Sequence, residues 1–580
     1  MKHTLYFLIV LFLSLYFDVQ AQEPVTLPLR FDHYYTYDQM VSALKILNKT
    51  YPELTDLEIV GKSEEGRDIY LITINNKATG APSEKPGVYV DGNIHGNEIQ
   101  ASEVCLYLAN RLLENFGKND KITEVINKNT WYILPCVNVD GRVHFFKDPN
   151  DPGSGRSIRI AVDDDRDGLI DEDYPDDLNG DGSITMMKKK DPFGKYKTDP
   201  DDARLLVPVK PGEMGEWVLL GEEGIDNDDD GRINEDSEGY VDGNRNWGYS
   251  WNPPYVQSGS GLYPFSGTGI RAIGTWLINH PNIIMVYAFH NSGGMFLRGP
   301  SIKIAGELPA QDISVYDYLG KNNEQIVPGY RYLISWKDLY PTYGDFTDFT
   351  NNLIGTYSFV GELTANNTET YSGKPINTPD SPANMFGENS QQERERLKFN
   401  DNVVQGELYL PWKKFNHPVY GEIEIGGWVK ISSRLPHSFM LQDMVHRISA
   451  AVIFSAGQTP EVKLEVTEKK SVGKNLYQVT VRLSNSKAMP SMTYLSIKNN
   501  LYPKDILKIR GEGIKVISGG LLTNPYSNLV VFKDSKPEVQ FCQVPGLGKI
   551  EYRFIISGKG KVNIEYESRK AGKRSAQIDL

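Results

Sequence analysis

Two histidines and one glutamate are spaced so that they could hold a metal ion. His95 and Glu98 are three residues apart and follow an apolar segment, residues 87–93. A strand end and the first turn of a helix can direct two such side chains toward one point. His290 follows another apolar segment, residues 283–289. Because catalytic zinc takes three protein ligands and leaves a fourth position for water, these three residues are the candidate ligands of one zinc ion.

The segments around these residues predict the fold that brings them together. Helical periodicity covers residues 33–51 and 97–113, and strand-like segments cover 55–61, 69–75, 87–93, 131–134 and 283–289. Strands alternating with helices predict an α/β fold with a mixed, mostly parallel sheet flanked by helices. Ligands in such sheets bind beyond the carboxyl ends of the strands, where His95 and His290 are expected.

The charge balance of the chain excludes some partners. The net charge is −13 over 580 residues, and much of the acidic excess falls between residues 163 and 236. Nucleic acid is not an expected partner, because binding its phosphates requires clustered lysine and arginine. Three cysteines do not make a disulfide framework in a chain of this size.

The N-terminus has the pattern of a signal peptide, residues 1–21. Lys2 precedes an apolar run over residues 5–17, and small residues at 19 and 21 suit cleavage. The run is shorter than the ~20 residues that span a bilayer, and no later segment predicts a membrane span. We therefore expect export to an extracellular or periplasmic location.

Composition divides the rest of the chain into two predicted domains. Residues 22–457 form the α/β domain, with an insertion at 148–238 that is rich in Asp, Gly, Asn and Pro. Residues 458–580 alternate apolar and polar side chains with period two, for example at 462–466 and 477–483. This pattern predicts a C-terminal β-sandwich.

The insertion repeats a pattern that is typical of calcium loops. Oxygen-bearing side chains alternate before a glycine that permits a sharp turn, and an apolar anchor follows. The position-12 glutamate of an EF-hand is missing from all three loops. The expected structural calcium ligands are Asp163, Asp165 and Asp167, then Asp177, Asn179 and Asp181, then Asp226, Asp228 and Asp230.

Ordered motifs over roughly residues 35–400 resemble those of the funnel-type zinc carboxypeptidases, the A/B/D family. The His-x-x-Glu at His95 has the Gly-Asn pair of the N/E branch. Four later blocks are similar to family blocks, at residues 135–141, 241–247, 263–267 and 357–363. The resemblance implies one catalytic zinc and hydrolysis of peptides.

The resemblance also implies roles for individual residues. Glu362 matches the general base, and Asn244 and Arg245 match the pair that binds the substrate's terminal carboxylate. Counting back from Asp348 gives Tyr340 as the mobile tyrosine of the family, acting in both binding and catalysis, with Tyr343 as the alternative.

Three departures from the family pattern concern substrate binding. The arginine that stabilises the oxyanion has no match, and Lys188, Lys189, Lys190 and Arg204 are the available substitutes. Asn97 stands where the A branch has arginine, and Asn291-Ser292 replaces the usual pair after the third ligand. Thr347, at the position that sets side-chain preference, leaves that preference open.

The sequence thus predicts a zinc metallocarboxypeptidase that removes the C-terminal residue of a peptide with a free carboxylate. One alternative within this chemistry is an enzyme for cell-wall peptide stems. Another is a non-catalytic, calcium-dependent binding protein on a peptidase scaffold. The oligomeric state is not predicted.

Overall fold

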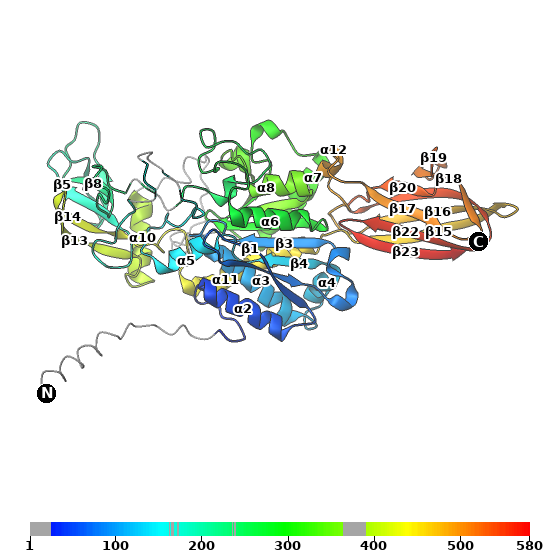
Figure 1. The fold of residues 1–580 in the computed structure, drawn as a ribbon, viewed down its shortest axis with the longest axis horizontal. Coiled ribbons are helices and arrows are strands. Elements are labelled where there is room, and N and C mark those ends of the chain that lie inside the picture. The colour runs from blue at the N-terminus through cyan, green and yellow to red at the C-terminus, as the bar shows by residue number, and fades with distance from the viewer. Residues whose placement is uncertain are drawn as a thin grey trace.

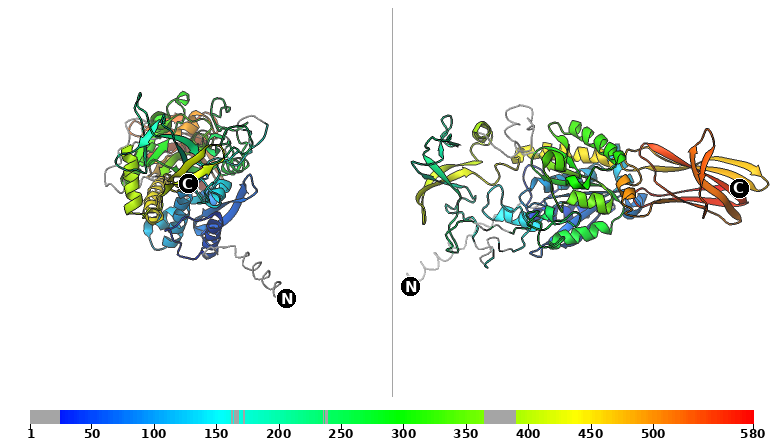
Figure 2. Two further views of the ribbon diagram at one scale, coloured as in Figure 1. Left: turned by 90° about the vertical axis from the view of Figure 1, so that its left-hand side faces the viewer. Right: turned by 90° about the horizontal axis from the view of Figure 1, so that it is seen from above.

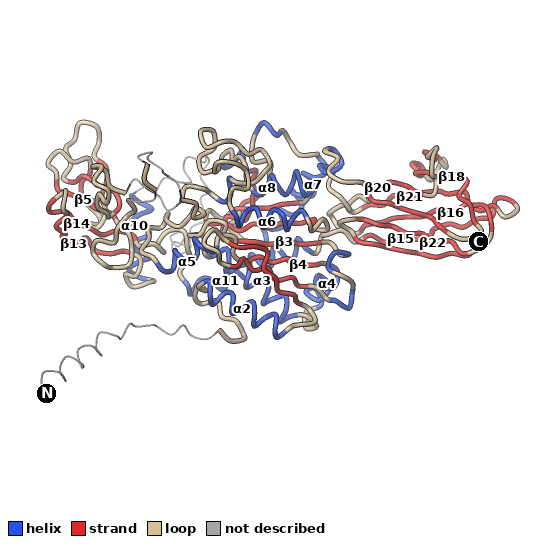
Figure 3. The backbone as a smooth tube through the Cα atoms, in the orientation of Figure 1, coloured by secondary structure: helices blue, strands red, loops and turns tan. Residues whose placement is uncertain are grey.

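The computed structural model describes residues 25–161, 163, 168–170, 173–234, 236, 239–363 and 390–580. The predicted signal peptide, Asp165 and Asp167 lie outside these residues. The molecule is elongated, with a helix-containing body in the middle and β-rich parts at its two ends (Figures 1 and 2). Figure 3 shows that most helices gather in the central body.

An eight-stranded mixed sheet forms the middle of the molecule. Its strands, in order across the sheet, are β1 (Thr55–Lys62), β2 (Asp68–Ile74), β4 (Thr130–Leu134), β3 (Gly87–Gly92), β9 (Ile283–Asn291), β12 (Tyr357–Leu363), β10 (Met295–Arg298) and β11 (Arg331–Ile334). The central strands β4, β3, β9 and β12 run parallel to one another. The sheet confirms the predicted α/β fold.

Helices flank this sheet and supply the rest of its core. Their bounds are α2 (Tyr37–Thr50), α3 (Gln100–Asn115), α4 (Asp120–Lys128), α5 (Val139–Lys147), α6 (Thr268–Ile278), α7 (Ala310–Ile326), α8 (Phe346–Phe349), α10 (Ser390–Asn402), α11 (Ser438–Ala456) and, farther along, α12 (Tyr494–Lys498). Helix α3 packs on β3 and β9, and α11 packs on α3. All of β3 and β9 is buried, which explains their nearly continuous apolar sequences.

Two local differences from the predicted elements matter for the site. Helix α3 begins at Gln100, so Glu98 lies in a turn whose backbone nitrogen donates to the carbonyl of His95. Strand β9 continues to Asn291, so His290 is a strand residue. Both side chains are therefore held by backbone hydrogen bonds next to the sheet.

The Asp-rich insertion contains strands that its composition did not predict. A six-stranded sheet has the order β13 (Tyr409–His417), β14 (Gly421–Trp428), β5 (Met186–Lys190), β8 (Trp217–Glu222), β6 (Tyr196–Thr198) and β7 (Leu206–Pro208). Met187 of the insertion packs with Ile423 and Ile425 in a small separate core. Strand β14, which pairs with β5, lies more than 200 residues later in the chain. Local sequence periodicity therefore gave little indication of this sheet.

The C-terminal region is a sandwich of two antiparallel sheets around one core, as predicted. One sheet has the order β15 (Val462–Gly473), β16 (Leu476–Asn485), β21 (Gly548–Gly558), β18 (Ile514–Asn524) and β19 (Leu529–Phe532). The other has the order β20 (Val539–Cys542), β17 (Asp505–Arg510), β22 (Lys561–Ser568) and β23 (Gly572–Asp579). Side chains of both sheets share that core, including Val479, Phe554, Leu507 and Ile564.

Among the described residues, no helix is both long enough and apolar enough to cross a membrane.

Candidate metal centre and catalytic site

The three predicted zinc ligands meet at the carboxyl ends of β3 and β9. The Nδ1 atoms of His95 and His290 are 3.2 Å apart. One carboxylate oxygen of Glu98 lies 3.0 Å from His95 Nδ1, and the other lies 3.1 Å from His290 Nδ1. All three residues are at least 97% buried. The structure therefore brings together three ligand atoms from residues as far as 195 positions apart in the sequence.

Asp242 supports this cluster from behind. Its Oδ1 lies 2.9 Å from His95 Nε2. With the Nε2 proton held by this carboxylate, the lone pair of His95 lies on Nδ1 and faces the cluster. The His95 and Arg156 charges outweigh the effect of burial and hold the pKa of Asp242 well below its usual range. Asp242 therefore stays ionised and fixes the ring of His95.

The donor set fits zinc. Two neutral imidazole nitrogens and one carboxylate are a common ligand set of catalytic zinc, and such a site keeps one position open. Burial alone would raise the pKa of Glu98, but the hydrogen bonds of His95 and His290, and the charge that these rings carry when protonated, lower it well below its usual value. A ligand that is ionised before the metal arrives makes binding easier.

Glu362 stands beside the metal cluster because of strand register. Strands β9 and β12 run parallel, and Glu362 pairs directly with His290 across them. Desolvation by the surrounding protein raises the pKa of Glu362 to about 7, although the charge that His290 carries when protonated opposes this rise. A carboxyl group with a pKa near neutrality is suited to accept and return a proton.

Arg156 is a candidate functional residue that the sequence did not reveal. Its Nη1 lies 3.1 Å from Glu98 Oε1, its Nη2 lies 2.9 Å from His95 Nε2, and both Nε and Nη2 reach Asp242. This guanidinium can stabilise negative charge developing next to the metal. The available signal was weak: an arginine in a Gly-Ser-Gly-Arg run 15 residues after Gly141, at the start of the insertion.

The other basic residues considered for this role lie in or beside the six-stranded sheet and have other partners. Lys188 pairs with Glu424, and Lys189 donates to the carbonyl of Tyr420. Lys190 stacks on Trp217. Arg204 forms ion pairs with Asp202 and Asp401. Within the described residues, the partners of these four side chains lie outside the metal cluster, so Arg156 replaces them as the candidate.

The predicted carboxylate-binding pair is linked to the metal cluster through Asp242. Asn244 and Arg245 belong to a short 3-10 turn, Gly243–Arg245, that Asp242 caps by accepting from the Asn244 backbone. Asn244 Oδ1 accepts from the backbone of Phe346, and Arg245 Nη1 donates to the carbonyl of Asn244. Asp242 therefore couples this turn directly to His95.

The two tyrosines and Thr347 lie around the same turn. Tyr340 is 40% exposed, and its phenol is close enough to Arg156 to influence the pKa of that guanidinium. The Tyr343 backbone nitrogen donates to Gln257. Thr347 is buried in α8, and Asp345 and Asp348 flank it in the sequence.

Two groups of acidic side chains form in the insertion. Asp177 and Asp181 converge with Glu223, and Asp226 and Asp228 converge with Asp173; within each group the oxygens lie within 4.8 Å of one another. Sequence reasoning found two members of each group and missed the third, which comes from outside the repeat.

The remaining predicted calcium ligands that the structure describes are not members of these two groups, although two of them contact a member. The side-chain amide nitrogen of Asn179 donates to Glu223, so the nitrogen of this amide faces that acidic group. Asp230 accepts from the backbone of Arg232. Asp163 belongs to neither group.

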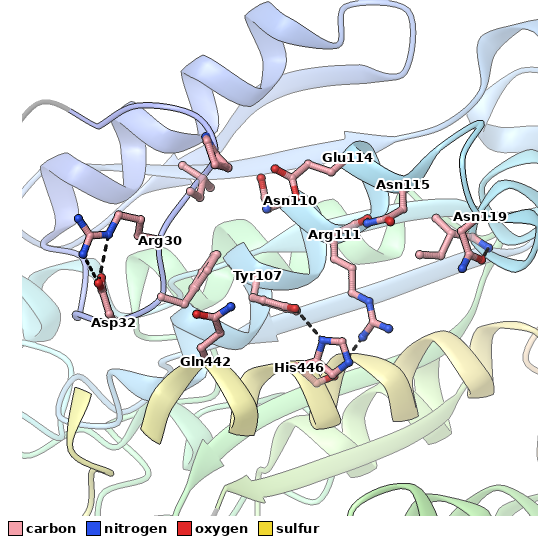
Figure 4. Close-up of a pocket in the computed structure, with 14 residues that line it drawn as sticks. Arg30, Asp32, Tyr107, Asn110, Arg111, Glu114, Asn115, Asn119, Gln442 and His446 are labelled. Atoms are coloured by element: carbon pink, nitrogen blue, oxygen red, sulfur yellow. Dashed lines mark hydrogen bonds and ion pairs between the residues drawn. The ribbon is translucent and has the colours of Figure 1, made fainter. Parts of the chain in front are cut away.

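A cavity of about 500 Å³ lies elsewhere, between the N-terminal segment and helices α3 and α11 (Figure 4). Tyr107 and Arg111 each hydrogen-bond to His446 on its wall. None of the metal-cluster residues lines it. The chemistry described above therefore belongs to the strand ends and not to this cavity.

Comparison with known proteins agrees with the site geometry. Residues 40–198 match the zinc carboxypeptidase family model, and residues 461–579 match a domain of unknown function. Carboxypeptidase D of Drosophila melanogaster is 30% identical over 158 residues, which are 27% of this chain and 10% of that protein. The catalytic chain of human carboxypeptidase N is 32% identical over 168 residues, 28% of this chain and 35% of that protein.

Solved structures are more distant in sequence. A carboxypeptidase A from Helicoverpa armigera is 20% identical, with a TM-score of 0.40, over 63% of this chain and 72% of that chain. In the two carboxypeptidases compared by sequence, the matched segments span about a third or less of the relative's length. The segment matched by the zinc carboxypeptidase family model includes His95, Glu98 and Arg156.

Proposed function

We propose that this protein is a zinc-dependent metallocarboxypeptidase that hydrolyses the C-terminal peptide bond of a peptide with a free carboxylate. One observation carries the proposal: three buried ligand atoms converge beside Glu362, which is paired in register with His290. The match of residues 40–198 to the zinc carboxypeptidase family model supports the same function.

His95, Glu98 and His290 would hold the zinc ion. Zinc supplies a Lewis acid for the scissile carbonyl and lowers the pKa of a water molecule. Glu362 removes a proton from the attacking water and then passes it to the departing amine. The raised pKa of Glu362 suits both halves of this transfer.

The neighbouring side chains bind and orient the substrate. Arg156 donates to the oxygen that gains negative charge during attack. Asn244 and Arg245 bind the terminal carboxylate, since a guanidinium can form two charge-assisted hydrogen bonds to it. Tyr340, partly exposed near Arg156, contacts the bound peptide and donates from its hydroxyl.

The acidic groups of the insertion are proposed to bind calcium. Glu223 supports this role, because its side chain is fully buried yet faces Asp177 and Asp181. Burial and these two carboxylates raise the pKa of Glu223 to about 7. Hard oxygen ligands of this kind suit calcium, which would order the insertion.

Residues 1–21 are proposed to direct export and to be removed. Amino-terminal sequencing of the protein from its secreting host tests this proposal. A start near residue 22 is expected, and a start at Met1 would contradict it.

Metal analysis combined with mass spectrometry of a peptide library tests the main proposal. Wild-type protein should contain one zinc per chain and shorten peptides one residue at a time from the carboxyl end. Glu362→Gln should keep the zinc and lose the cleavage. Zinc without cleavage of any free peptide would redirect the proposal to cell-wall peptides, and absence of zinc would contradict it.

A further inference from the structure

Arg434 brings another guanidinium to the catalytic site from a segment far beyond the one that the family model matches. It lies in the loop between β14 and α11. Its Nη1 is 3.6 Å from Glu98 Oε1 and donates to the carbonyl of Asn291 at 3.2 Å. The side chain of Asn291 donates in return to the carbonyl of Arg434. Arg434 is thus tied to the residue that follows His290.

The loop that carries Arg434 is fixed on its other side as well. Leu435 is buried against Ile99 and Phe145. The hydroxyl of Tyr34 donates to the carbonyl of Pro436. An arginine between such anchors loses little further conformational freedom when it binds a ligand, which favours a binding role over that of a mobile surface charge.

Most of the hydrogen-bonding capacity of Arg434 is available. A guanidinium has five N–H donors, but within the described residues only Nη1 has partners. The side chain is 35% exposed although it contacts the metal cluster. When Glu98 serves as a zinc ligand, its charge is committed to the metal. Among the described residues Arg434 has no other ion pair, and it acts on the carboxylate of Glu362 without pairing with it.

The contacts place three arginines in order along the site. The Arg245 backbone nitrogen donates to the carbonyl of Asp242, Arg156 contacts both Asp242 and Glu98, and Arg434 contacts Glu98 and the carbonyl of Asn291. The proposed terminal-carboxylate position is at Arg245. Arg434 is therefore across the metal ligands from it, where the residues on the amino side of the scissile bond must pass.

We infer that Arg434 binds an acidic side chain of the substrate on the amino side of the scissile bond. This inference rests on the proposed carboxypeptidase function and names a substrate class for it: peptides with Glu or Asp before the terminal residue. A carboxylate there would meet the free Nε and Nη2 donors in the fork geometry that arginine favours.

Matched peptides test the inference on the zinc-loaded mature protein. Two sets carry Glu or Gln either directly before the terminal residue or one position earlier, and are otherwise identical. The ratio of kcat/KM for the Glu peptide to that for the Gln peptide should be about 10- to 100-fold at one of these positions, the range of a charge-assisted hydrogen bond. Arg434→Gln should bring this ratio to about one, and Arg434→Lys should retain part of it.

Arg447→Gln is the matched control, because Arg447 lies on the neighbouring helix α11 and pairs with Asp443 at the surface. It should leave the ratio unchanged. A wild-type ratio near one at both positions, or a ratio that survives in Arg434→Gln, overturns the inference while the carboxypeptidase function stands. If wild-type protein cleaves neither peptide, the proposed function itself fails.

Circular dichroism and zinc content show whether Arg434→Gln is folded and loaded. If that variant fails to fold, the inference is tested instead with Arg434→Lys and with the salt dependence of the wild-type ratio. A real charge contact predicts a ratio that falls as salt rises, because ions screen a partly exposed pair. A large ratio that is insensitive to salt and unchanged in Arg434→Lys overturns the inference.

Discussion

The metal cluster and the Asp-rich insertion both gather ligand-type side chains, but they do so by different means. His95, Glu98 and His290 come from distant segments, are almost fully buried, and are aligned by the register of a sheet. The acidic groups of the insertion come mainly from short repeats in exposed loops, such as Asp177 and Asp181. A buried, prearranged set can hold a catalytic metal rigidly, whereas local loops suit a structural ion that orders them.

Removal of a ligand from each region should separate the two kinds of site most strongly. His290→Ala should lose zinc and lower kcat/KM by about 10³-fold or more, because zinc supplies several kcal/mol of transition-state stabilisation. Asp177→Asn should retain zinc and nearly all activity. Metal analysis measures the zinc content of both variants, and peptide assays measure their activity. Equal zinc loss in the two variants would contradict the assignment of His290 and Asp177 to separate metal sites.

The next effect concerns Arg156, which belongs to the insertion by sequence but to the catalytic site by contact. Arg156→Ala should lower kcat by about 10²- to 10³-fold, the usual result of removing an oxyanion donor. Arg159→Ala is the matched control, since Arg159 lies three residues later and pairs with Glu65. Zinc content should be unchanged in both. A similar loss of activity in the two variants would indicate a general disturbance of the segment instead.

The same comparison explains how far sequence could lead. His95 and His290 could be found because each follows a short apolar strand, and parallel strands end at one edge of a sheet. Glu362 was identified through resemblance alone, since nothing local distinguishes it from a solvated strand residue. Its place beside His290 depends on register, which the sequence of one strand does not encode.

Residues that act through long-range contacts could not be found in this way. Arg156 and Arg434 lie in irregular segments, and their positions depend on chain packing around them. Glu223 and Asp173 join the acidic loops from outside the repeats. The strands β5–β8 pair with one another and, through β14, with a much later part of the chain, so a period search within the insertion had little to detect.

A pH profile tests the electrostatics of the catalytic site. Because the pKa of Glu362 is raised, from 4.5 to about 7, the base becomes protonated as pH falls through that value and activity is lost on the acid side. Bound zinc adds positive charge and shifts the pKa back toward 4.5, so the acid limb of kcat/KM should lie between these values. Arg156→Ala and Arg434→Gln each remove a charge that lowers this pKa, and both should move the limb to higher pH. A limb that stays fixed in both variants would contradict the assignment of Glu362 as the base.

Calcium should produce the smallest effect, and on stability more than on catalysis. Addition of calcium to zinc-loaded protein in calcium-free buffer should raise the Tm by a few degrees, because an ion at 100 times its Kd contributes about 2.7 kcal/mol to a unit that binds it only when folded. Glu223→Gln should reduce the shift by removing a buried ligand, while Glu216→Gln, a change outside both acidic groups, should not. The response should also weaken below about pH 7, because Glu223 has a pKa of about 7 and its protonated form is a poor calcium ligand. An unchanged Tm with calcium at every pH would leave the acidic groups as solvated loops, and the insertion would then be ordered by its sheet alone.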